Sequence, residues 1–211
     1  MCRPVSGQAP ARSAGGVFHI KLLPMSAHQL IVGGQRSGKS GHAETLARRW
    51  QAGGGRVGVV ATALAADDEM RARIAHHRAS RPAGFDTIEA PLALSAALQQ
   101  ADDAGTMLIV DCLTLWLVNW LMPMSGAADA SGWAVERQTL LDLLPRLKSP
   151  VVFVSNEVGW GVSPLGREVR DYVDELGRLN QDVARRCGQL TLMVAGQAWT
   201  RPVENEPRSG S

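Results

Sequence analysis

The amino-acid sequence predicts an α/β fold with a mostly parallel sheet and helices on both faces. Short, continuous apolar runs alternate along the chain with longer stretches of helical pattern, which is typical of strands that are buried on both faces. In addition, residues 33–40 read Gly-Gly-Gln-Arg-Ser-Gly-Lys-Ser and match the phosphate-binding pattern G-x-x-x-x-G-K-[ST]. Together these observations predict a P-loop NTPase-like domain of the RecA-like type.

The phosphate-binding loop lies in the context that its motif requires. An apolar run at 30–32 precedes it, and a helical pattern at 41–51 follows it. Glycines allow successive backbone N–H groups to face phosphate oxygens, and the helix N-terminus adds partial positive charge. We expect Lys39 to reach the β- and γ-phosphates and Ser40 to ligate Mg²⁺. The residues expected to bind the triphosphate are Gly33, Gly34, Gln35, Arg36, Ser37, Gly38, Lys39 and Ser40.

The remaining elements follow in order along the chain. Further strands are expected at 57–62, 86–89, 107–111, 151–155 and 190–194. Further helices are expected at 67–79, 92–101, 113–122, 133–147 and 165–187. Residues 123–132, rich in Met, Gly, Ala and Ser, are expected to form a surface loop.

Composition is consistent with one catalytic domain, which we place at residues 29–200 of the 211-residue chain. Residues 1–28 are expected to be a flexible extension, with Met25 as an alternative translation start, and residues 201–211 a flexible tail. A net charge of +2 without a Lys/Arg run gives little support for nucleic-acid binding. No apolar stretch approaches the roughly 20 residues of a membrane span, and no secretory signal is apparent, so we expect a cytoplasmic protein.

The strand expected at 107–111 ends in a carboxylate, Asp111, as a Walker B strand does. A carboxylate at the end of a strand beside the P-loop strand can hold Mg²⁺ directly or through water. Alternatively, Asp111 is a turn residue, since Asp is common where strands end. With the P-loop present we favour the first interpretation, and Ser40 and Asp111 are the candidate metal-binding residues.

A polar loop that contains two glycines, residues 156–161, follows the strand expected at 151–155. Ligands of open α/β sheets gather outside the carboxyl ends of the strands. The loop is therefore a candidate for contact with a second substrate. Within it, Trp160 is either an exposed stacking surface or a hydrophobic plug.

The segment 62–82 contains an acidic triplet, two adjacent histidines and four arginines. If the segment is helical, Met70, Ile74 and His77 share one stripe, spaced four and three residues apart. His76 then lies about 100° around the helix axis and is free to meet a ligand. The pattern alone favours a structural histidine pair. In the alternative interpretation, arginines bind phosphates beside a neutral, nucleophilic histidine.

A set of short motifs along residues 29–197 forms an unusual combination. The motifs are residues 33–40 with His42-Ala43-Glu44, Ala61-Thr62, Asp68-Glu69-Met70 with Arg73-Ile74 and His76-His77, Arg81-Pro82, Asp111-Cys112-Leu113-Thr114, residues 156–161, and residues 177–181. This combination resembles the adenosylcobinamide kinase/adenosylcobinamide-phosphate guanylyltransferase family.

The resemblance implies a bifunctional enzyme of cobalamin nucleotide-loop assembly that uses Mg²⁺. ATP or GTP would phosphorylate the aminopropanol hydroxyl of adenosylcobinamide, and GTP would then transfer GMP to the resulting phosphate. The histidine that carries GMP covalently in the family matches His76, whose neutral imidazole would displace pyrophosphate. The resemblance further implies that the protein is a homotrimer.

Site roles implied by the resemblance extend beyond the P-loop. His76 and Lys39 would be catalytic, and Arg36 would add positive charge beside the transferred group. Further nucleotide-binding positions would be Ala61, Thr62, Ala63, His77, Arg78, Ala79, Ser80, Glu89 and Asp111.

Two other functions compete with this interpretation. A generic P-loop small-molecule kinase would form no covalent nucleotide at His76. A nucleotide switch or assembly ATPase would need partner-facing switch loops, and the sequence offers no regulatory domain for them. Labelled GTP distinguishes the three, since an acid-labile, alkali-stable label indicates a phosphoramidate.

Overall fold

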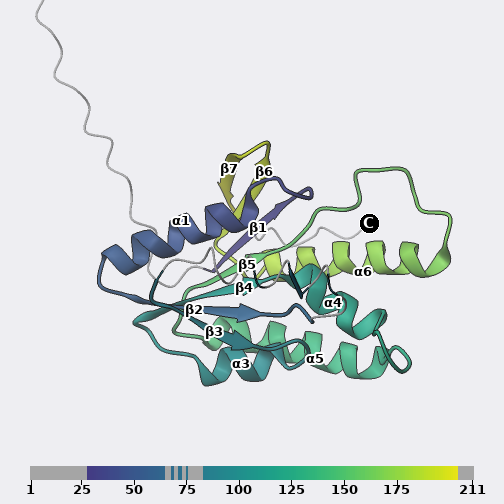
Figure 1. Cartoon of the computed structure of the whole chain (residues 1–211), viewed down its shortest axis with the longest axis horizontal. Helices are drawn as coiled ribbons and strands as arrows, with labels where there is room; N and C mark the ends of the chain where they lie inside the picture. Colours follow the sequence, from purple (N-terminus) through teal and green to yellow (C-terminus); the bar gives the residue numbers. More distant parts are fainter. Residues whose placement is uncertain (1–27, 65–67, 69–70, 73–74, 76–82, 204–211) are drawn as a thin grey trace, which may run out of the picture.

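A seven-stranded, mostly parallel sheet forms the centre of the molecule (Figure 1). The structure is a computed structural model and describes residues 28–64, 68, 71–72, 75 and 83–203. The strands are β1 (Gln29–Gly33), β2 (Arg56–Ala61), β3 (Phe85–Glu89), β4 (Thr106–Asp111), β5 (Val151–Val154), β6 (Gln189–Val194) and β7 (Gln197–Pro202). Their order in the sheet is β3-β2-β4-β5-β1-β6-β7, and β7 alone among them pairs antiparallel.

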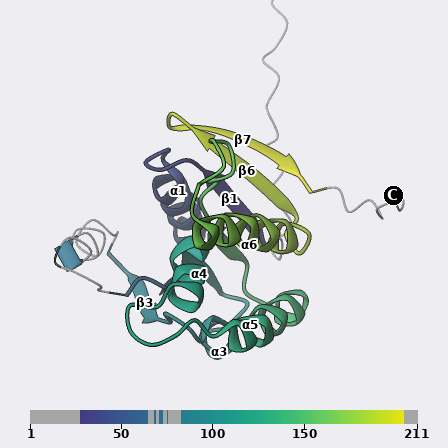
Figure 2. The same ribbon diagram turned by 90° about the vertical axis from the view of Figure 1, so that its right-hand side faces the viewer.

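Helices cover both faces of this sheet, but unequally (Figures 1 and 2). Helix α1 packs on one face, and four further helices pack on the other. The bounds are α1 (Lys39–Ala52), α3 (Leu94–Gln100), α4 (Leu113–Leu121), α5 (Ala130–Leu143) and α6 (Arg167–Ala184), with a 3₁₀ turn, η1 (Leu144–Arg146). Within the described residues, no helix has both the length and the apolar character needed to cross a bilayer.

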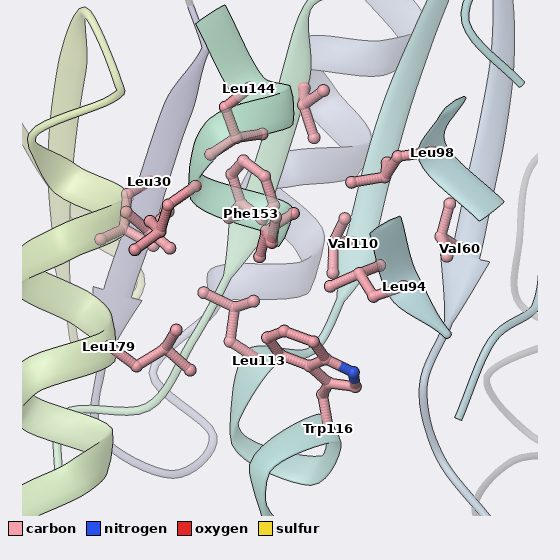
Figure 3. Packing of buried hydrophobic residues seen from close by; sticks show 14 of the residues in the cluster. Leu30, Val60, Leu94, Leu98, Val110, Leu113, Trp116, Leu144, Phe153 and Leu179 are labelled. Atoms are coloured by element: carbon pink, nitrogen blue, oxygen red, sulfur yellow. The ribbon is translucent and has the colours of Figure 1, made fainter. Parts of the chain in front are cut away.

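The larger hydrophobic core lies between the sheet and helices α3 to α6 (Figure 3). Side chains alternate along β5, so that Val151 and Phe153 face this core while Val152 and Val154 face α1. Phe153 is fully buried among leucines and valines of the neighbouring strands and helices. All four residues of β5 are buried, because the strand lies in the middle of the sheet and is covered on both faces.

His28, which was expected to be the last residue of the flexible extension, belongs to the folded region. Its side chain is buried and lies between η1 and the start of β5. The Val151 N–H donates to His28 Nδ1 at 3.1 Å, so the other ring nitrogen, Nε2, donates to the Leu144 carbonyl at 2.8 Å. Burial lowers the pKa of His28 below the ordinary value for histidine, which is consistent with a neutral ring.

Six strands, the parallel sheet and the helices on both faces confirm the predicted fold class. The main error is β7, whose last residues, Arg201 and Pro202, were assigned to the flexible tail. A two-residue turn, Ala195-Gly196, with φ of 49° and 78°, folds β7 back onto β6. The loop expected at 123–132 is also shorter than predicted, since Asp129 accepts a hydrogen bond from the Gly132 N–H and α5 begins at Ala130.

Candidate nucleotide-binding site

The P-loop connects β1 to the N-terminus of α1, as the motif predicts. Gly33 sits where the backbone is crowded, since a Cβ there would lie 2.4 Å from the Met193 carbonyl oxygen of β6. Gly38 has φ of 99°, a left-handed conformation that side chains disfavour, and it immediately precedes α1. Arg36, at the exposed tip, also has positive φ, of 55°. The loop backbone therefore has the tight shape that phosphate binding needs.

Lys39 is buried and turned into the loop. Its Nζ donates to the carbonyl oxygens of Gly33 at 3.0 Å and Gly34 at 2.7 Å. Burial lowers the pKa of Lys39, while nearby negative charge opposes that shift. Burial also raises the pKa of the Cys112 thiol to about 11, so near neutral pH the thiol carries no charge. Asp111 is therefore the anion that supports the Lys39 ammonium.

The turn between β6 and β7 supports the P-loop from the other side. The Gly196 N–H donates to the Ser37 carbonyl at 3.0 Å. Ser37 is buried, and its hydroxyl has no hydrogen-bond partner among the described residues. A buried hydroxyl without a partner inside a phosphate-binding loop is a donor that a bound phosphate oxygen would satisfy.

Asp111 lies at the carboxyl end of β4, as predicted, but β4 is not beside the P-loop strand. Strand β5 lies between β1 and β4 in the sheet, which corrects our expectation. Neighbouring strands lie about 4.8 Å apart, so two steps separate the end of β4 from β1 by roughly 10 Å. A carboxylate and a P-loop serine can span that distance around a cation and its water.

Glu89 lies farther along the same sheet edge than Asp111 does. Ala61, at the end of β2, pairs with Glu89 of β3 on one side and with Asp111 of β4 on the other. Glu89 is thus four strands from β1, or roughly 19 Å in the plane of the sheet. That separation does not support a cation shared between Glu89 and the P-loop, and it restricts Glu89 to a contact elsewhere on a ligand.

Three oxygen-bearing side chains line one small pocket on the α1 face of the sheet. Ser40 and Glu44 come from α1, four residues apart and therefore on one face of the helix, and Asp111 comes from β4. The rest of the lining is apolar: Ala43, Val59, Phe85, Ile109 and Val154. Ser40 and Asp111, the candidate metal-binding residues, are thus brought together. Glu44 was not predicted to be part of the site, although its spacing from Ser40 was a usable signal.

Thr62, a predicted nucleotide-binding position, has its side chain engaged inside the protein. Its side chain is fully buried, and its hydroxyl donates to the Cys112 carbonyl at 2.7 Å and accepts from the Cys112 N–H at 2.8 Å. The Thr62 N–H also donates to the Asp111 carbonyl at 3.2 Å. A side-chain contact between Thr62 and a nucleotide is therefore not supported. Instead, Thr62 holds the backbone of Asp111 and Cys112 in place through these three hydrogen bonds. Ala61 and Ala63 remain partly exposed at the sheet edge.

The loop at 156–161 is fixed at its start and exposed beyond it. The Glu157 N–H donates to the Gly33 carbonyl at 3.1 Å, and the Asn156 N–H donates to Thr114 Oγ1 at 2.8 Å. Asn180 of α6 donates to the Asn156 carbonyl at 3.1 Å. Trp160 is 72% exposed, which excludes the plug and supports the exposed stacking surface. The loop thus starts against the P-loop and presents an aromatic ring to solvent.

The histidine segment was expected to supply the nucleophile. His76, His77, Arg78, Ala79 and Ser80 lie outside the described residues. Of the helix expected at 67–79, residues 68, 71, 72 and 75 are described, and all four are helical. The roles assigned to His76 and to the four residues after it stay predictions.

The fold and the site define a class of protein. A phosphate-binding loop between β1 and α1, one strand inserted between the P-loop strand and the strand ending in Asp111, and a mostly parallel sheet together identify a P-loop NTPase-like protein of the RecA-like type.

Comparison with known proteins then shows the family. Residues 29–200 match the family described as cobinamide kinase / cobinamide phosphate guanyltransferase. The chain is 49% identical over 178 residues to the bifunctional adenosylcobalamin biosynthesis protein CobP of Pseudomonas aeruginosa, covering 84% of this chain and 98% of that protein. It is 35% identical over 176 residues to CobU of Escherichia coli, covering 79% of this chain and 95% of that protein. The chain belongs to this family of bifunctional transferases.

Solved structures with lower similarity include an ATPase domain, with a TM-score of 0.47 and 12% identity over 80% of this chain and 69% of that one. The flagellar accessory protein FlaH from Methanocaldococcus jannaschii has a TM-score of 0.45 and 14% identity, over 82% of this chain and 75% of that one.

Proposed function

We propose that this protein phosphorylates adenosylcobinamide and then converts the phosphate to adenosyl-GDP-cobinamide. The observation that carries the proposal is the P-loop site itself, with Lys39, Ser40 and Asp111 gathered at one edge of the sheet. The chain containing this site matches the family over residues 29–200.

In the kinase step, the aminopropanol hydroxyl of the substrate attacks the γ-phosphorus of ATP or GTP. The bond between the β,γ-bridging oxygen and the γ-phosphorus breaks, the nucleoside diphosphate leaves, and the hydroxyl proton is released. Backbone N–H groups of the loop hold the triphosphate, and Lys39 turns from the Gly33 and Gly34 carbonyls toward the β- and γ-phosphates. The exposed Arg36 adds positive charge beside the transferred group.

In the guanylyl-transfer step, His76 attacks the α-phosphorus of GTP and pyrophosphate leaves. The cobinamide phosphate oxygen then displaces the imidazole, so that a pyrophosphate linkage forms and His76 is regenerated. The proposal for His76 rests on the family resemblance and on the helical position predicted for it. His77, Arg78, Ala79, Ser80 and Glu89 are proposed to contact GTP in this step.

The pocket residues fit a magnesium ion. Mg²⁺ prefers oxygen ligands and is usually held by one or two carboxylates together with substrate phosphates. A hydroxyl and two carboxylates line the pocket beside the P-loop. Among the described residues no three His, Cys, Asp or Glu side chains cluster as a metal site. Phosphate oxygens and water would complete the ligand set. When bound, Mg²⁺ would neutralise charge on the β- and γ-phosphates, with Ser40 and Asp111 holding it.

We assign the loop at 156–161 to contact with the corrinoid. It starts against the P-loop, and its exposed Trp160 offers an apolar face to a large ring system. The proposed homotrimer rests on the family resemblance alone, and light scattering on the purified protein tests it.

Product analysis tests the proposed function. The protein is incubated with adenosylcobinamide, Mg²⁺ and GTP labelled at the α-phosphorus, and the corrinoids are separated by chromatography and mass. We expect adenosylcobinamide phosphate first and a labelled GDP-cobinamide afterwards, with acid-labile, alkali-stable label on the protein in between. A phosphorylated product without any guanylylated corrinoid or labelled protein would reduce the protein to a kinase. No corrinoid product would refute the proposal.

A further inference from the structure

Glu44 is the second carboxylate of the pocket that Ser40 and Asp111 line. It lies on α1 one helical turn beyond Ser40 and lines the same pocket as Asp111. Among the described residues its carboxylate makes no hydrogen bond or ion pair, although it is only partly exposed. Every other wall of the pocket is apolar apart from Ser40 and Asp111.

Two carboxylates of this pocket lie beside the loop that would hold the triphosphate. Asp111 already supports the Lys39 ammonium, which itself turns toward the loop carbonyls. Glu44 adds a second carboxylate to the pocket that Asp111 lines. A nucleoside triphosphate would bring three to four further negative charges to the adjacent loop. Placing a carboxylate there opposes nucleotide binding unless a divalent cation lies between the two.

We propose that Glu44 is a positioning residue for the nucleotide-bound Mg²⁺, which it holds together with Ser40 and Asp111, directly or through a water of the ion's shell. Mg²⁺ dehydrates reluctantly and keeps several waters, so a carboxylate one helical turn from Ser40 suits the outer shell of the ion. The inference rests on the proposed use of a nucleoside triphosphate by this P-loop. It extends that function by making nucleotide affinity depend on the cation.

The test compares nucleotide binding with and without Mg²⁺, because a metal-positioning role predicts that removing the Glu44 charge has opposite effects on affinity in the two solutions. Glu44→Gln keeps the shape of the side chain and removes its charge. The dissociation constant of α,β-methylene-GTP is measured by calorimetry in excess EDTA and in saturating MgCl₂. The P–C–P bridge blocks attack at the α-phosphorus, and no acceptor is added, so binding is read without turnover. Glu168→Gln is the control, since it removes an exposed carboxylate at the first turn of α6.

With Mg²⁺ present, we expect Glu44→Gln to weaken binding of the analogue about tenfold, because loss of an outer-shell partner typically costs ten- to a hundredfold in metal affinity. In EDTA we expect the same variant to bind the analogue as tightly as wild type or more tightly, because one repulsive charge is gone. Glu168→Gln is expected to match wild type in both solutions. Glu44→Asp, which keeps the charge on a shorter side chain, is expected to lie between wild type and Glu44→Gln in Mg²⁺.

Three results would overturn the inference. Equal weakening in EDTA and in Mg²⁺ would indicate a purely structural role. Unchanged binding in both, with lost turnover, would place Glu44 on the substrate hydroxyl instead. If Glu44→Gln does not fold, wild-type response to Mg²⁺ in Glu44→Asp would equally exclude the metal role. Failure of the wild-type protein to bind the analogue at all would instead refute the proposed function, so the two failures are distinguishable.

Discussion

Replacing Thr62 by Val tests whether the hydroxyl found here holds the end of β4 in place. The two side chains have almost the same shape, but the hydroxyl is replaced by a methyl group, so the substitution chiefly tests the lost hydrogen bonds. Thr62 is fully buried, and its hydroxyl makes two hydrogen bonds with the backbone of Cys112, at 2.7 and 2.8 Å. The substitution removes both at once and leaves the Cys112 N–H and carbonyl without those partners.

The expected loss of stability follows from these two bonds. A net hydrogen bond contributes roughly 0.5–1.5 kcal/mol, and an unsatisfied buried group costs about 1–3 kcal/mol. Both Cys112 groups lie where the residue is only partly buried, so water can replace some of the interaction. We therefore expect the free energy of unfolding to fall by about 1–3 kcal/mol. For a protein of this size that corresponds to a melting temperature lower by roughly 3–10 °C.

Urea denaturation of the two proteins measures this change. Thr139→Val is the matched control, because Thr139 is exposed and its hydroxyl donates to the Val135 carbonyl of its own helix, with no other partner among the described residues. We expect the control to stay within about 0.5 kcal/mol of wild type. Kinase turnover of Thr62→Val should also fall, since Asp111 is adjacent to the freed peptide groups. Unchanged stability in Thr62→Val would show that the hydroxyl does not hold this junction, and the reasoning would fail.

Three further predictions concern Lys39, the histidine pair and His28. Lys39→Ala should abolish kinase turnover and lower guanylylation, since both steps use the same loop; near-normal turnover in the folded variant would contradict the assignment. His76→Ala should eliminate covalent GMP incorporation but keep some phosphorylation of adenosylcobinamide, whereas His77→Ala should mainly lower stability or GTP affinity; label mapped to His77 would refute the choice of nucleophile. Burial lowers the pKa of His28 in the folded protein. Below about pH 6.5 the unfolded chain therefore binds a proton on His28 that the folded protein does not. The free energy of unfolding should decrease as the pH falls through that range. His28→Gln should lose that part of the slope in urea titrations between pH 5 and 8.

Most of the six predicted strands could be recognised because their apolar runs are nearly continuous, as in β1, where all five residues are buried. Strand β3 is the exception, since apolar and polar residues are mixed along it and none is buried. Strand β7 has the opposite character, since all six of its residues are exposed and it ends in Pro202. Its signal was the Ala195-Gly196 turn, which is weak because Ala rarely adopts positive φ. Strand order was also beyond the sequence pattern, because which strands pair depends on long-range contacts rather than on each strand's composition.

At the site, the motif specified the residues expected to bind phosphate, because glycine and lysine at this fixed spacing are typical of a phosphate-binding loop. The motif did not specify residues outside the loop, such as Thr62 and Glu44, that position other groups of the site. Thr62 follows a strand, as a ligand-contacting residue would, and only the fold shows that its hydroxyl is used inside the protein. The spacing of Glu44 from Ser40 indicated a shared helix face, but its proximity to Asp111 depends on the position of β4 relative to α1, which the helix pattern alone does not contain.

The placement of β1 has a consequence for biosynthesis. The strand that starts the P-loop pairs with β5 and β6, so that Gln29 lies opposite Val152 on one side and Gln189 on the other. The loop itself is hydrogen-bonded to Gly196. A ribosome that has made the first 150 residues has therefore produced the phosphate-binding motif but neither of the strands that hold it. Domains with such distant pairings fold slowly. Ribosome-bound chains stalled near residue 150 should not retain a nucleotide analogue, whereas chains with residues up to about 203 outside the exit tunnel should.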